Sequence, residues 1–235
     1  MLRPFLYLLL WIPCTLAGQN LVKNPEFEQH TSCPDRPGQI NLALYWYSPS
    51  TATPDYFNDC SPGIDYGTEF NKKGGQLPHS GHAYAGMQFY YLNHNEYYEY
   101  IQTALDTALT PGQLYCISLF TSMGTARYAL KHLDAVLSVT EVKNHSAGRM
   151  ILPCTELGNG QMLTDQDQWM CLHGIYKAKG GERFLTLGCF SPGDSFWHIK
   201  TGTQPDSLFK STYYFVDDVA LTAIQDSAAC KCLTK

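Results

Sequence analysis

The segment that most constrains this chain lies near its end, Tyr-Tyr-Phe-Val-Asp-Asp-Val-Ala-Leu-Thr at residues 213–222. Its composition predicts a β-strand, in which side chains alternate between two faces. One face then carries Asp217 together with a set of apolar residues, Tyr213, Phe215, Val219 and Leu221. An unpaired carboxylate on a core face costs too much free energy to be kept. We therefore expect a cation or several backbone N–H groups to bind Asp217, or a β-bulge to displace it.

The size and charge of the chain narrow both the fold class and the function. A chain of 235 residues with 44% hydrophobic residues can bury a full core, which predicts one all-β domain. Charged residues make up only 16%, and the formal net charge is -5. The densest basic spot is the pair Lys72 and Lys73. Because no basic run is present to neutralise phosphates, we expect no nucleic acid partner.

The first residues of the chain have the layout of a secretory signal. Arg3 is followed by an apolar run at residues 5–12 and then by small residues up to Gly18. We predict three parts: a signal peptide over 1–18, a β-sandwich domain over 19–225 and a C-terminal tail over 226–235. No later stretch reaches about 20 apolar residues, so we expect no membrane span and a secreted or cell-surface location.

Removal of this signal leaves eight cysteines: Cys33, Cys60, Cys116, Cys154, Cys171, Cys189, Cys230 and Cys232. An even number of cysteines in an exported chain predicts disulfides. A zinc site is the alternative, but no Cys-x-x-Cys pair occurs, and Cys230 and Cys232 are too close in sequence for a good clamp. The pairing that we prefer is Cys33 with Cys60, which bracket one polar loop. Cys116 lies inside an apolar strand and fits a buried thiol.

Short apolar segments separated by turn residues predict an antiparallel β-sandwich. A Thr-Pro-Gly turn signal lies between residues 96–101 and 113–122, so we expect these two strands to pair, with the second in the centre of a sheet. A short first strand at 20–28 is expected to anchor Phe27 in the core. Further strands are expected at 83–91, 135–142, 169–177 and 183–190. Residues 31–81 are rich in Pro, Gly, Ser, Asp and Asn, which predicts long loops.

Six motifs in one order carry a resemblance to a known family. They are Asn-Leu-Val-Lys-Asn-Pro-Glu-Phe-Glu (20–28), Gly-Gln-Ile-Asn-Leu-Ala (38–43), Pro-Asp-Tyr-Phe-Asn-Asp-Cys (54–60), Pro-His-Ser-Gly-His-Ala-Tyr-Ala-Gly (78–86), Glu-Tyr-Ile-Gln (99–102) and Val-Asp-Asp-Val (216–219). Over nearly the whole mature chain, this set resembles a family of exported domains found at the N-termini of cell-surface proteins of gliding bacteria. Such domains are often followed by a peptidoglycan-binding or secretion-sorting domain, whereas this chain ends at Lys235.

The opening and closing motifs are also distantly similar to carbohydrate-binding modules. The similarity rests on Asn-Pro-x-Phe-Glu at the start of the mature chain and Asp-Asp-Val near its end. It implies an antiparallel jelly-roll β-sandwich of the galactose-binding-like type with long loops. In such modules the first and last strands lie near each other, and a structural calcium ion commonly sits beside them.

The resemblance and the buried acid together predict a structural calcium ion. Calcium takes about six to eight hard oxygen ligands, which one or two carboxylates and backbone carbonyls can supply. Asp217 is the first candidate ligand, followed by Glu28 and then Asp218. The alternative is that Asp217 accepts backbone hydrogen bonds and Glu28 is solvated.

Aromatic and amide side chains in the loops suggest a ligand site for glycan. Sugars bind with an apolar ring face against Trp or Tyr, while amides and carboxylates satisfy the hydroxyl groups. The candidate ligand-binding residues are Tyr90, Tyr91, Asn93, Glu96, Trp197 and His198. We therefore predict a non-catalytic binding or adhesion module that recognises a glycan or cell-surface polysaccharide.

Two other functions stay open at this point. The first is a structural surface protein that uses its aromatic loops to bind a protein partner. The second is a glycan-directed hydrolase that uses His79 or His82 with a nearby carboxylate. Neither a Gly-x-Ser-x-Gly nor a His-Glu-x-x-His motif occurs, so we prefer a protein that is not an enzyme. Asn144 begins a glycosylation sequon, which we expect to be unmodified in a bacterium.

Overall fold

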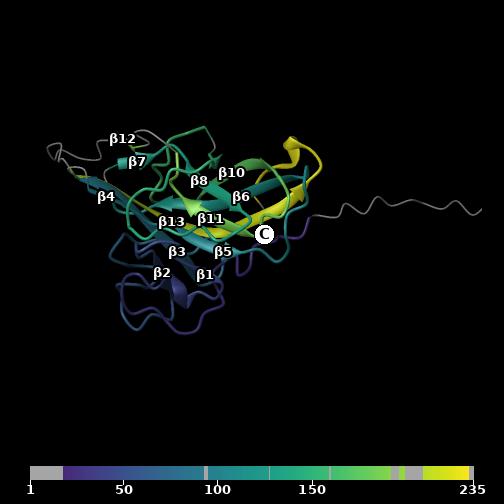
Figure 1. Cartoon of the computed structure of the whole chain (residues 1–235). Helices are drawn as coiled ribbons and strands as arrows, with labels where there is room; N and C mark the ends of the chain where they lie inside the picture. Colours follow the sequence, from purple (N-terminus) through teal and green to yellow (C-terminus); the bar gives the residue numbers. More distant parts are fainter. Residues whose placement is uncertain are drawn as a thin grey trace, which may run out of the picture.

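Two antiparallel sheets face each other in the computed structural model, which describes residues 18–92, 95–126, 128–158, 160–191, 196–198 and 209–232 (Figure 1). Sheet 1 has five strands, in the order β1 (Trp46–Tyr47), β5 (Ile101–Ala104), β11 (Phe184–Gly188), β8 (Leu133–Ser138) and β9 (Thr155–Leu157). Sheet 2 has six, in the order β10 (Met170–Lys177), β6 (Leu114–Met123), β13 (Phe209–Ile224), β3 (Ala83–Leu92) and β2 (Asp55–Asn58), with β4 (Asn95–Tyr98) also paired to β3.

Small elements complete the described part of the chain. They are the strand pair β7 (Tyr128–Leu130) and β12 (Phe196–His198), and the 3-10 helices η1 (Ile40–Leu42) and η2 (Ser227–Ala229). The predicted signal peptide lies outside the described residues except for Gly18. None of the helices that the structure describes has the length and apolar character to cross a membrane.

The order of the strands is that of a jelly roll. The chain passes from β3 in sheet 2 to β5 in sheet 1, returns with β6, and crosses again to β8 and β9. It then passes to β10 in sheet 2, to β11 in sheet 1 and finally to β13 in sheet 2. The eight strands therefore form the two four-stranded halves β5-β11-β8-β9 and β10-β6-β13-β3, which confirms the predicted antiparallel jelly-roll β-sandwich.

One large apolar core fills the space between the sheets, and the N-terminal segment contributes to it. Phe27 is fully buried there and packs on Trp46, with ring centroids 4.9 Å apart, so its predicted anchoring role is confirmed. The strand expected at 20–28 is wrong, because this segment makes only an isolated bridge from Val22 to Leu105. Asn24 and Phe27 have φ angles of 47° and 61°, which interrupt an extended chain.

The predicted pairing of 96–101 with 113–122 is also wrong. The first segment is divided between β4, which pairs with β3, and β5, which pairs with β1 and β11. The second segment is β6, between β10 and β13, so its predicted central position is confirmed. The turn signal was read as a hairpin, but the chain changes sheets at this point, from β5 in sheet 1 to β6 in sheet 2.

A β-bulge in β13 corrects the predicted face of this strand. The register against β6 shifts between Asp217 and Ala220, and Asp218 has a φ of 48°. Before the bulge, Tyr213 and Phe215 lie on the outer face of sheet 2, whereas after it Val219 and Leu221 lie in the main core. The four apolar residues therefore do not share one face, and Asp217 follows the outer set.

The outer face of sheet 2 is covered by other parts of the chain. An aromatic cluster lies on it, formed by Phe57, Tyr66, Tyr84, Tyr213 and Phe215. The segment 59–77 is fixed over this cluster, since the Tyr84 hydroxyl donates to the Thr68 carbonyl (3.0 Å) and Trp169 Nε1 donates to the Leu77 carbonyl (2.8 Å). The part of this face that carries the aromatic cluster is therefore covered by the segment 59–77.

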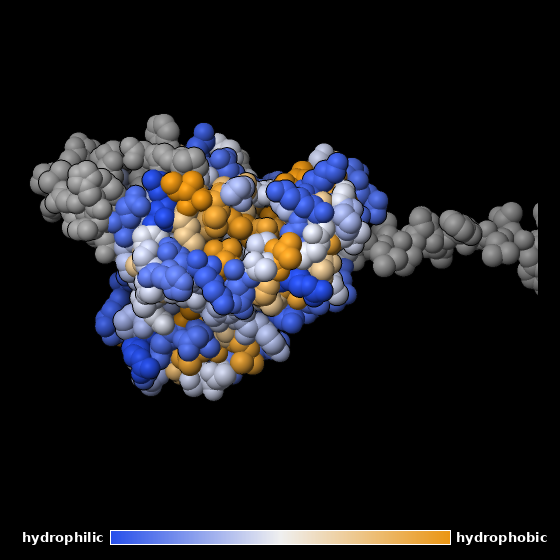
Figure 2. All heavy atoms as spheres, in the orientation of Figure 1, coloured by the Kyte–Doolittle hydropathy of each residue, from blue (hydrophilic) through white to orange (hydrophobic). Residues whose placement is uncertain are grey.

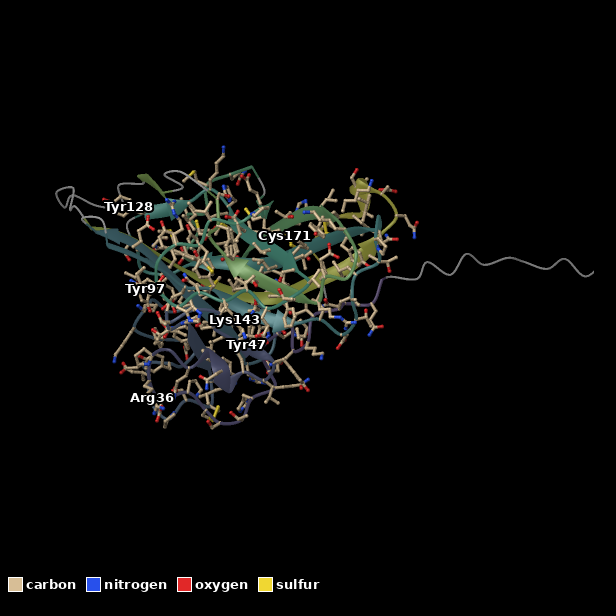
Figure 3. The ribbon with its side chains drawn as sticks, viewed as in Figure 1. Arg36, Tyr47, Tyr97, Tyr128, Lys143 and Cys171 are labelled. Atoms are coloured by element: carbon tan, nitrogen blue, oxygen red, sulfur yellow. A yellow bond between two sulfur atoms is a disulfide. The ribbon has the colours of Figure 1, made fainter. Side chains whose placement is uncertain are left out.

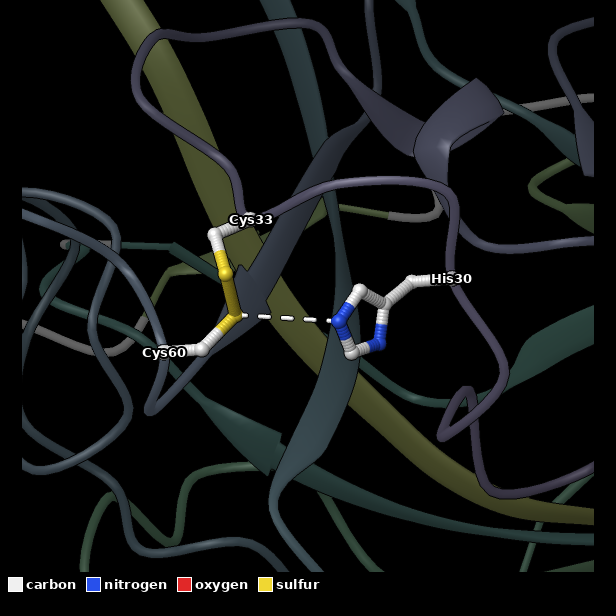
Figure 4. Close-up of side chains that lie close together, drawn as sticks. All are labelled: His30, Cys33 and Cys60. Atoms are coloured by element: carbon white, nitrogen blue, oxygen red, sulfur yellow. Dashed lines mark hydrogen bonds between the residues drawn. A yellow bond between two sulfur atoms is a disulfide. The ribbon is translucent and has the colours of Figure 1, made fainter.

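Three disulfides fix the loops and the tail. Cys33–Cys60 is confirmed, and its Cys60 sulfur lies 3.8 Å from His30 Nε2 (Figure 4). The predicted buried thiol at Cys116 is wrong, because Cys116 bonds to Cys230. Cys171 bonds to Cys232, so both tail cysteines are tied to neighbouring strands, β6 and β10. Cys154 and Cys189 carry thiols, so six of the eight cysteines form the disulfides.

Candidate binding site

Asp217 is completely buried at the bulge and accepts two backbone hydrogen bonds. Its donors are the N–H groups of Ser80 (3.1 Å) and Asp218 (2.7 Å). Burial, together with the charge of Asp218, raises the pKa of Asp217 to about 8, although these N–H groups counteract the effect. Two of the sequence-based alternatives, amide donors and a bulge, are thus both present.

The two neighbouring acids are held by the same segment, residues 79–83. Asp218 accepts from the Ser80 hydroxyl (2.8 Å) and contacts His79 Nδ1. Glu28 accepts from the N–H groups of His82 (2.7 Å) and Ala83 (3.0 Å), so it is not simply solvated. Gly81 has a φ of 63°, and a Cβ at this position would overlap with the Glu28 carboxylate.

The described atoms of Asp217, Asp218 and Glu28 are not arranged as a set of calcium ligands. Among the described residues, the group whose His, Cys, Asp or Glu ligand atoms lie within 4.8 Å of one another is His30 with Cys33 and Cys60, and its sulfurs form a disulfide. The carboxylates of Asp217 and Glu28 are satisfied by N–H donors. The burial of Asp217 is therefore explained without a metal ion, and calcium stays a prediction.

The two histidines that could serve a hydrolase, His79 and His82, each contact a carboxylate. His79 stacks on Phe120, with ring centroids 3.6 Å apart, while its Nδ1 contacts Asp218. The Ser80 hydroxyl donates to the same Asp218 (2.8 Å). His82 Nδ1 lies 2.6 Å from Asp59 at the surface. These contacts hold the loop and do not form the nucleophile–base pair that a triad requires.

Most of the predicted glycan residues lie at one end of the sandwich. Tyr90 and Tyr91 are at the far end of β3, paired with Tyr97 and Glu96 of β4. β12, which carries Trp197 and His198, lies at the same end of the molecule (Figure 1). Asn93 falls outside the described residues, as do the side chains of Tyr90, Tyr91, Trp197 and His198. Of the predicted set, the described side chain is that of Glu96.

Glu96 lies beside a pocket that was not predicted from the sequence. Its carboxylate lies 3.6 Å from the Arg149 guanidinium, which also sits 5.7 Å from the centre of the Tyr98 ring. Arg149 lines a pocket of about 440 Å3 together with other residues of one segment, which we call the 142–152 pocket: Val142, Lys143, Asn144, Ser146, Met150, Ile151 and Leu152. The predicted ligand residue and the pocket therefore share an ion pair.

The 142–152 pocket is built on the outer face of sheet 1. Gln102 of β5, which is fully buried, pairs with both backbone groups of Val142 (2.9 and 3.3 Å). Further along, the Ala147 carbonyl accepts from the Tyr98 N–H (2.8 Å), and the Met150 N–H donates to the Tyr100 hydroxyl (2.9 Å). The segment is thus bonded to β4 and β5 along its length, which gives the pocket a fixed backbone.

The rim of the 142–152 pocket combines charge with apolar surface. Lys143 Nζ lies 2.9 Å from Glu141, which also accepts from the Tyr47 hydroxyl (3.4 Å), and Figure 3 shows Tyr47 and Lys143 close together. Ile151 is 63% exposed. Figure 2 shows hydrophobic residues gathered on the visible face over the region where Figure 1 labels β8 and β11. A signal for this site was present in the apolar run Met-Ile-Leu that follows Arg149 in a polar loop.

Of the comparisons with known proteins, the one with solved structures found matches to this chain. No family model and no curated protein matches the chain. The CBM22-1 xylan-binding domain of Paenibacillus barcinonensis Xyn10C is 13% identical with a TM-score of 0.48, over 90% of this chain and 98% of that one. TmCBM61 in complex with β-1,4-galactotriose is 13% identical with a TM-score of 0.40, over 88% of this chain and 100% of that one.

A third similar structure is an adhesin domain. The K1 cleaved adhesin domain of Lys-gingipain from Porphyromonas gingivalis W83 is 14% identical with a TM-score of 0.40, over 88% of this chain and 99% of that one. Similarities this low carry no information on what the present chain binds.

Proposed function

We propose that this protein is an exported, non-catalytic binding module that recognises a glycan at the cell surface. The observation that carries the proposal is the 142–152 pocket beside Glu96, in which apolar side chains and hydrogen-bonding groups line one fixed concavity. A sugar presents an apolar ring face and a rim of hydroxyl groups, so its recognition needs both kinds of group within a few ångströms.

The residues of the pocket divide between these two tasks. Met150, Ile151 and Leu152 offer apolar surface, while Lys143 and Arg149 offer N–H donors. The guanidinium is already oriented by Glu96 and by the Tyr98 ring, so little side-chain freedom is lost when a ligand binds. Both cations are paired with an acid, Lys143 with Glu141 and Arg149 with Glu96, so they offer N–H donors to sugar hydroxyl groups and not an unbalanced positive charge.

The predicted residues of β3, β4 and β12 would extend this site from Glu96 towards the end of the molecule that carries β12. Tyr91 is opposite Glu96 in the β3–β4 register, so the strand edge that carries them continues from the pocket. Trp197 and His198 on β12 would supply an aromatic platform beyond it.

Binding to a glycan array tests the proposal. We expect Arg149→Ala and Ile151→Ala each to weaken binding about tenfold, since truncation of a well-packed contact residue costs more than about 1 kcal/mol. Val139→Ala is the matched control, because Val139 is 57% exposed on the preceding segment and does not line the pocket. Loss of binding in Trp197→Ala would extend the site to β12. Retained binding in Arg149→Ala, Tyr91→Ala and Trp197→Ala would contradict this location.

A structural calcium ion at the Asp217 junction remains a proposal within this function. The ion would bind Asp217 and main-chain carbonyls, with Glu28 or Asp218 as a second carboxylate, and would stabilise the fold without chemistry. Such an ion raises the unfolding temperature in calcium relative to a chelator, as does any ligand that binds the native state alone. An identical unfolding temperature in millimolar calcium and in EGTA would count against it.

A further inference from the structure

A second pocket lies within the segment 59–77. It has a volume of about 510 Å3, and we call it the 59–77 pocket after the residues that line it: Asp59, Ser61, Pro62, Gly63, Ile64, Gly67, Thr68, Glu69, Phe70 and Leu77. It shares none of these residues with the 142–152 pocket. The function proposed above makes no use of it.

Three large apolar side chains surround this pocket and are left in solvent. Ile64 is 78% exposed, Phe70 67% and Leu77 65%, the three highest values among the large hydrophobic residues that the structure describes. A single exposed apolar residue is ordinary, but a group of them around a concavity is typical of an interaction site. Figure 2 shows a smaller group of hydrophobic residues on the loops below β1 and β2.

The backbone under these side chains is fixed in place. Tyr66, between Ile64 and Phe70, is buried in the aromatic cluster, and its carbonyl accepts from the Asn58 N–H (3.2 Å). Thr68 is held by Tyr84, and the Leu77 carbonyl by Trp169. The apolar side chains therefore point outward from an ordered loop, so their exposure is not a result of fraying. A preordered surface loses less conformational entropy when a partner binds.

The charges that line the 59–77 pocket have one sign. Asp59 and Glu69 are both exposed, and the lining contains no Lys, Arg or His. Asp59 also contacts His82 Nδ1 (2.6 Å), which lies outside the lining, so Glu69 is the main acid for a partner's cation. Lys72, the nearest cation in sequence, lies 2.6 Å from Asp65 and is committed to that ion pair. A partner that matches this pocket must bring apolar surface together with positive charge.

We propose that the 59–77 pocket binds a segment of another protein in which a large apolar side chain lies next to Lys or Arg. Ile64, Phe70 and Leu77 receive the apolar side chain, while Asp59 and Glu69 face the cation. A glycan fits this lining less well, because two of the three large apolar side chains, Ile64 and Leu77, are aliphatic and the lining contains no cation or amide side chain. An anionic membrane surface is disfavoured by the two acids.

Titration with three short peptides, followed by amide chemical shifts of the labelled protein, tests the proposal. One peptide places Phe between two Lys residues, a second places Phe between two Glu residues, and a third places Ser between two Lys residues. We expect shifts in residues 59–77 with the first peptide alone. Phe70→Ser and Leu77→Ser should each weaken its binding about tenfold, and Glu69→Gln should weaken it and reduce its salt dependence.

Val139→Ser is the control, since it removes an exposed apolar side chain outside the pocket and should bind the Phe–Lys peptide as the native protein does. All these positions are exposed, so a melting curve checks that each variant is folded. No shift in residues 59–77 at millimolar peptide, or equal shifts with the acidic peptide, would overturn the proposal. So would concentration-dependent dimerisation in sedimentation that Phe70→Ser abolishes, because the occupant would then be a second copy. Glycan binding is measured in a separate experiment, so a failure of the proposal for the 59–77 pocket can be distinguished from a failure of the proposal for the 142–152 pocket.

Discussion

Asp55 and Glu99 are two buried carboxylates whose pKa depends on the fold. Glu99 accepts from the Gln88 N–H (2.6 Å) and from the Tyr97 hydroxyl (2.9 Å). Asp55 accepts from the Gly38 N–H (2.8 Å) and the Tyr213 hydroxyl (2.7 Å). Burial raises the pKa of both groups, that of Glu99 well above its usual value, and the nearby Asp55 charge adds to the effect on Glu99.

This perturbation predicts that stability falls as the pH rises. A carboxyl group whose folded-state pKa is raised keeps its proton in the native state after the unfolded chain has lost it, so the free energy of unfolding decreases above the unfolded pKa of about 4.3. Glu99→Gln imitates the protonated group, since an amide can donate to Tyr97 and accept from Gln88. We expect its unfolding temperature to decline less between pH 5 and pH 8 than that of the native protein.

The control for this measurement is Glu141→Gln. Glu141 is a surface carboxylate, and its hydrogen bond from Lys143 lowers its pKa. This substitution should leave the decline above pH 5 unchanged. An equal decline in Glu99→Gln and in the native protein would show that Glu99 is ionised in the fold.

Gly86 shows how closely single atoms are packed on the outer face of sheet 2. A Cβ at this position would overlap with the Tyr213 hydroxyl and with the Phe57 ring. We expect Gly86→Ala to lower the free energy of unfolding by about 1–3 kcal/mol, as overpacking of a tight core does. Urea unfolding measures this, with Gly63→Ala as the control, since no heavy atom lies within 4 Å of its added Cβ. Equal stability of the two variants would contradict the packing argument.

At the level of elements, the sequence predicts where the strands lie better than it predicts which strands pair. The central position of β6 follows from its apolar residues on both faces, and β3 was placed within a residue of its bounds. Which strand lies beside which depends on where the chain changes sheets, and a turn signal does not contain that information. The prediction that the apolar residues of β13 share one face was wrong for a related reason. A β-bulge shifts the alternation of faces along a strand without changing the local composition.

The C-terminal tail is an element that depends on covalent bonds. Cys116–Cys230 closes 114 residues and Cys171–Cys232 closes 61, and together they fix residues 226–232 on β6 and β10. Cross-links of this length stabilise by about 2–5 kcal/mol each, mainly by restricting the unfolded chain. We expect a double variant, Cys230→Ala with Cys232→Ala, to lose several kcal/mol in urea unfolding.

A variant at Cys154 supplies the control for the tail. Cys154 is outside the three disulfides, so Cys154→Ser should keep them all and change stability little. Peptide mapping without reduction then identifies each bond directly. A tail pairing other than Cys116–Cys230 and Cys171–Cys232 would refute this arrangement, as would a double variant as stable as the native protein.

At the scale of the whole molecule, the candidate site could be predicted only in part. Glu96 was identified because charged and amide residues beside aromatic ones suit a sugar. The rest of the 142–152 pocket depends on Gln102, which binds Val142 from 40 positions earlier in the chain. A contact of that separation leaves no local pattern. The sequence did not identify Ile64, Phe70 and Leu77 as a surface group for a similar reason, because only the fold shows that these side chains are exposed to solvent.

The two ends of the domain are joined by a few hydrogen bonds, as the sequence resemblance implied. Asn20 donates to the Val219 carbonyl (3.0 Å) and accepts from the N–H groups of Leu221 (2.9 Å) and Val22 (3.1 Å), and Figure 1 shows the two ends side by side. Asn20→Ala leaves partly buried backbone groups without partners, which should cost about 1–3 kcal/mol. The local readout is faster hydrogen exchange at the Leu221 amide, whereas Gln19→Ala, at an exposed neighbour, should change neither quantity. Unchanged exchange at Leu221 in Asn20→Ala would mean that the Asn20 side chain does not protect this amide, and that the backbone hydrogen bonds from Leu21 to Leu221 and from Val219 to Pro25 hold the ends together.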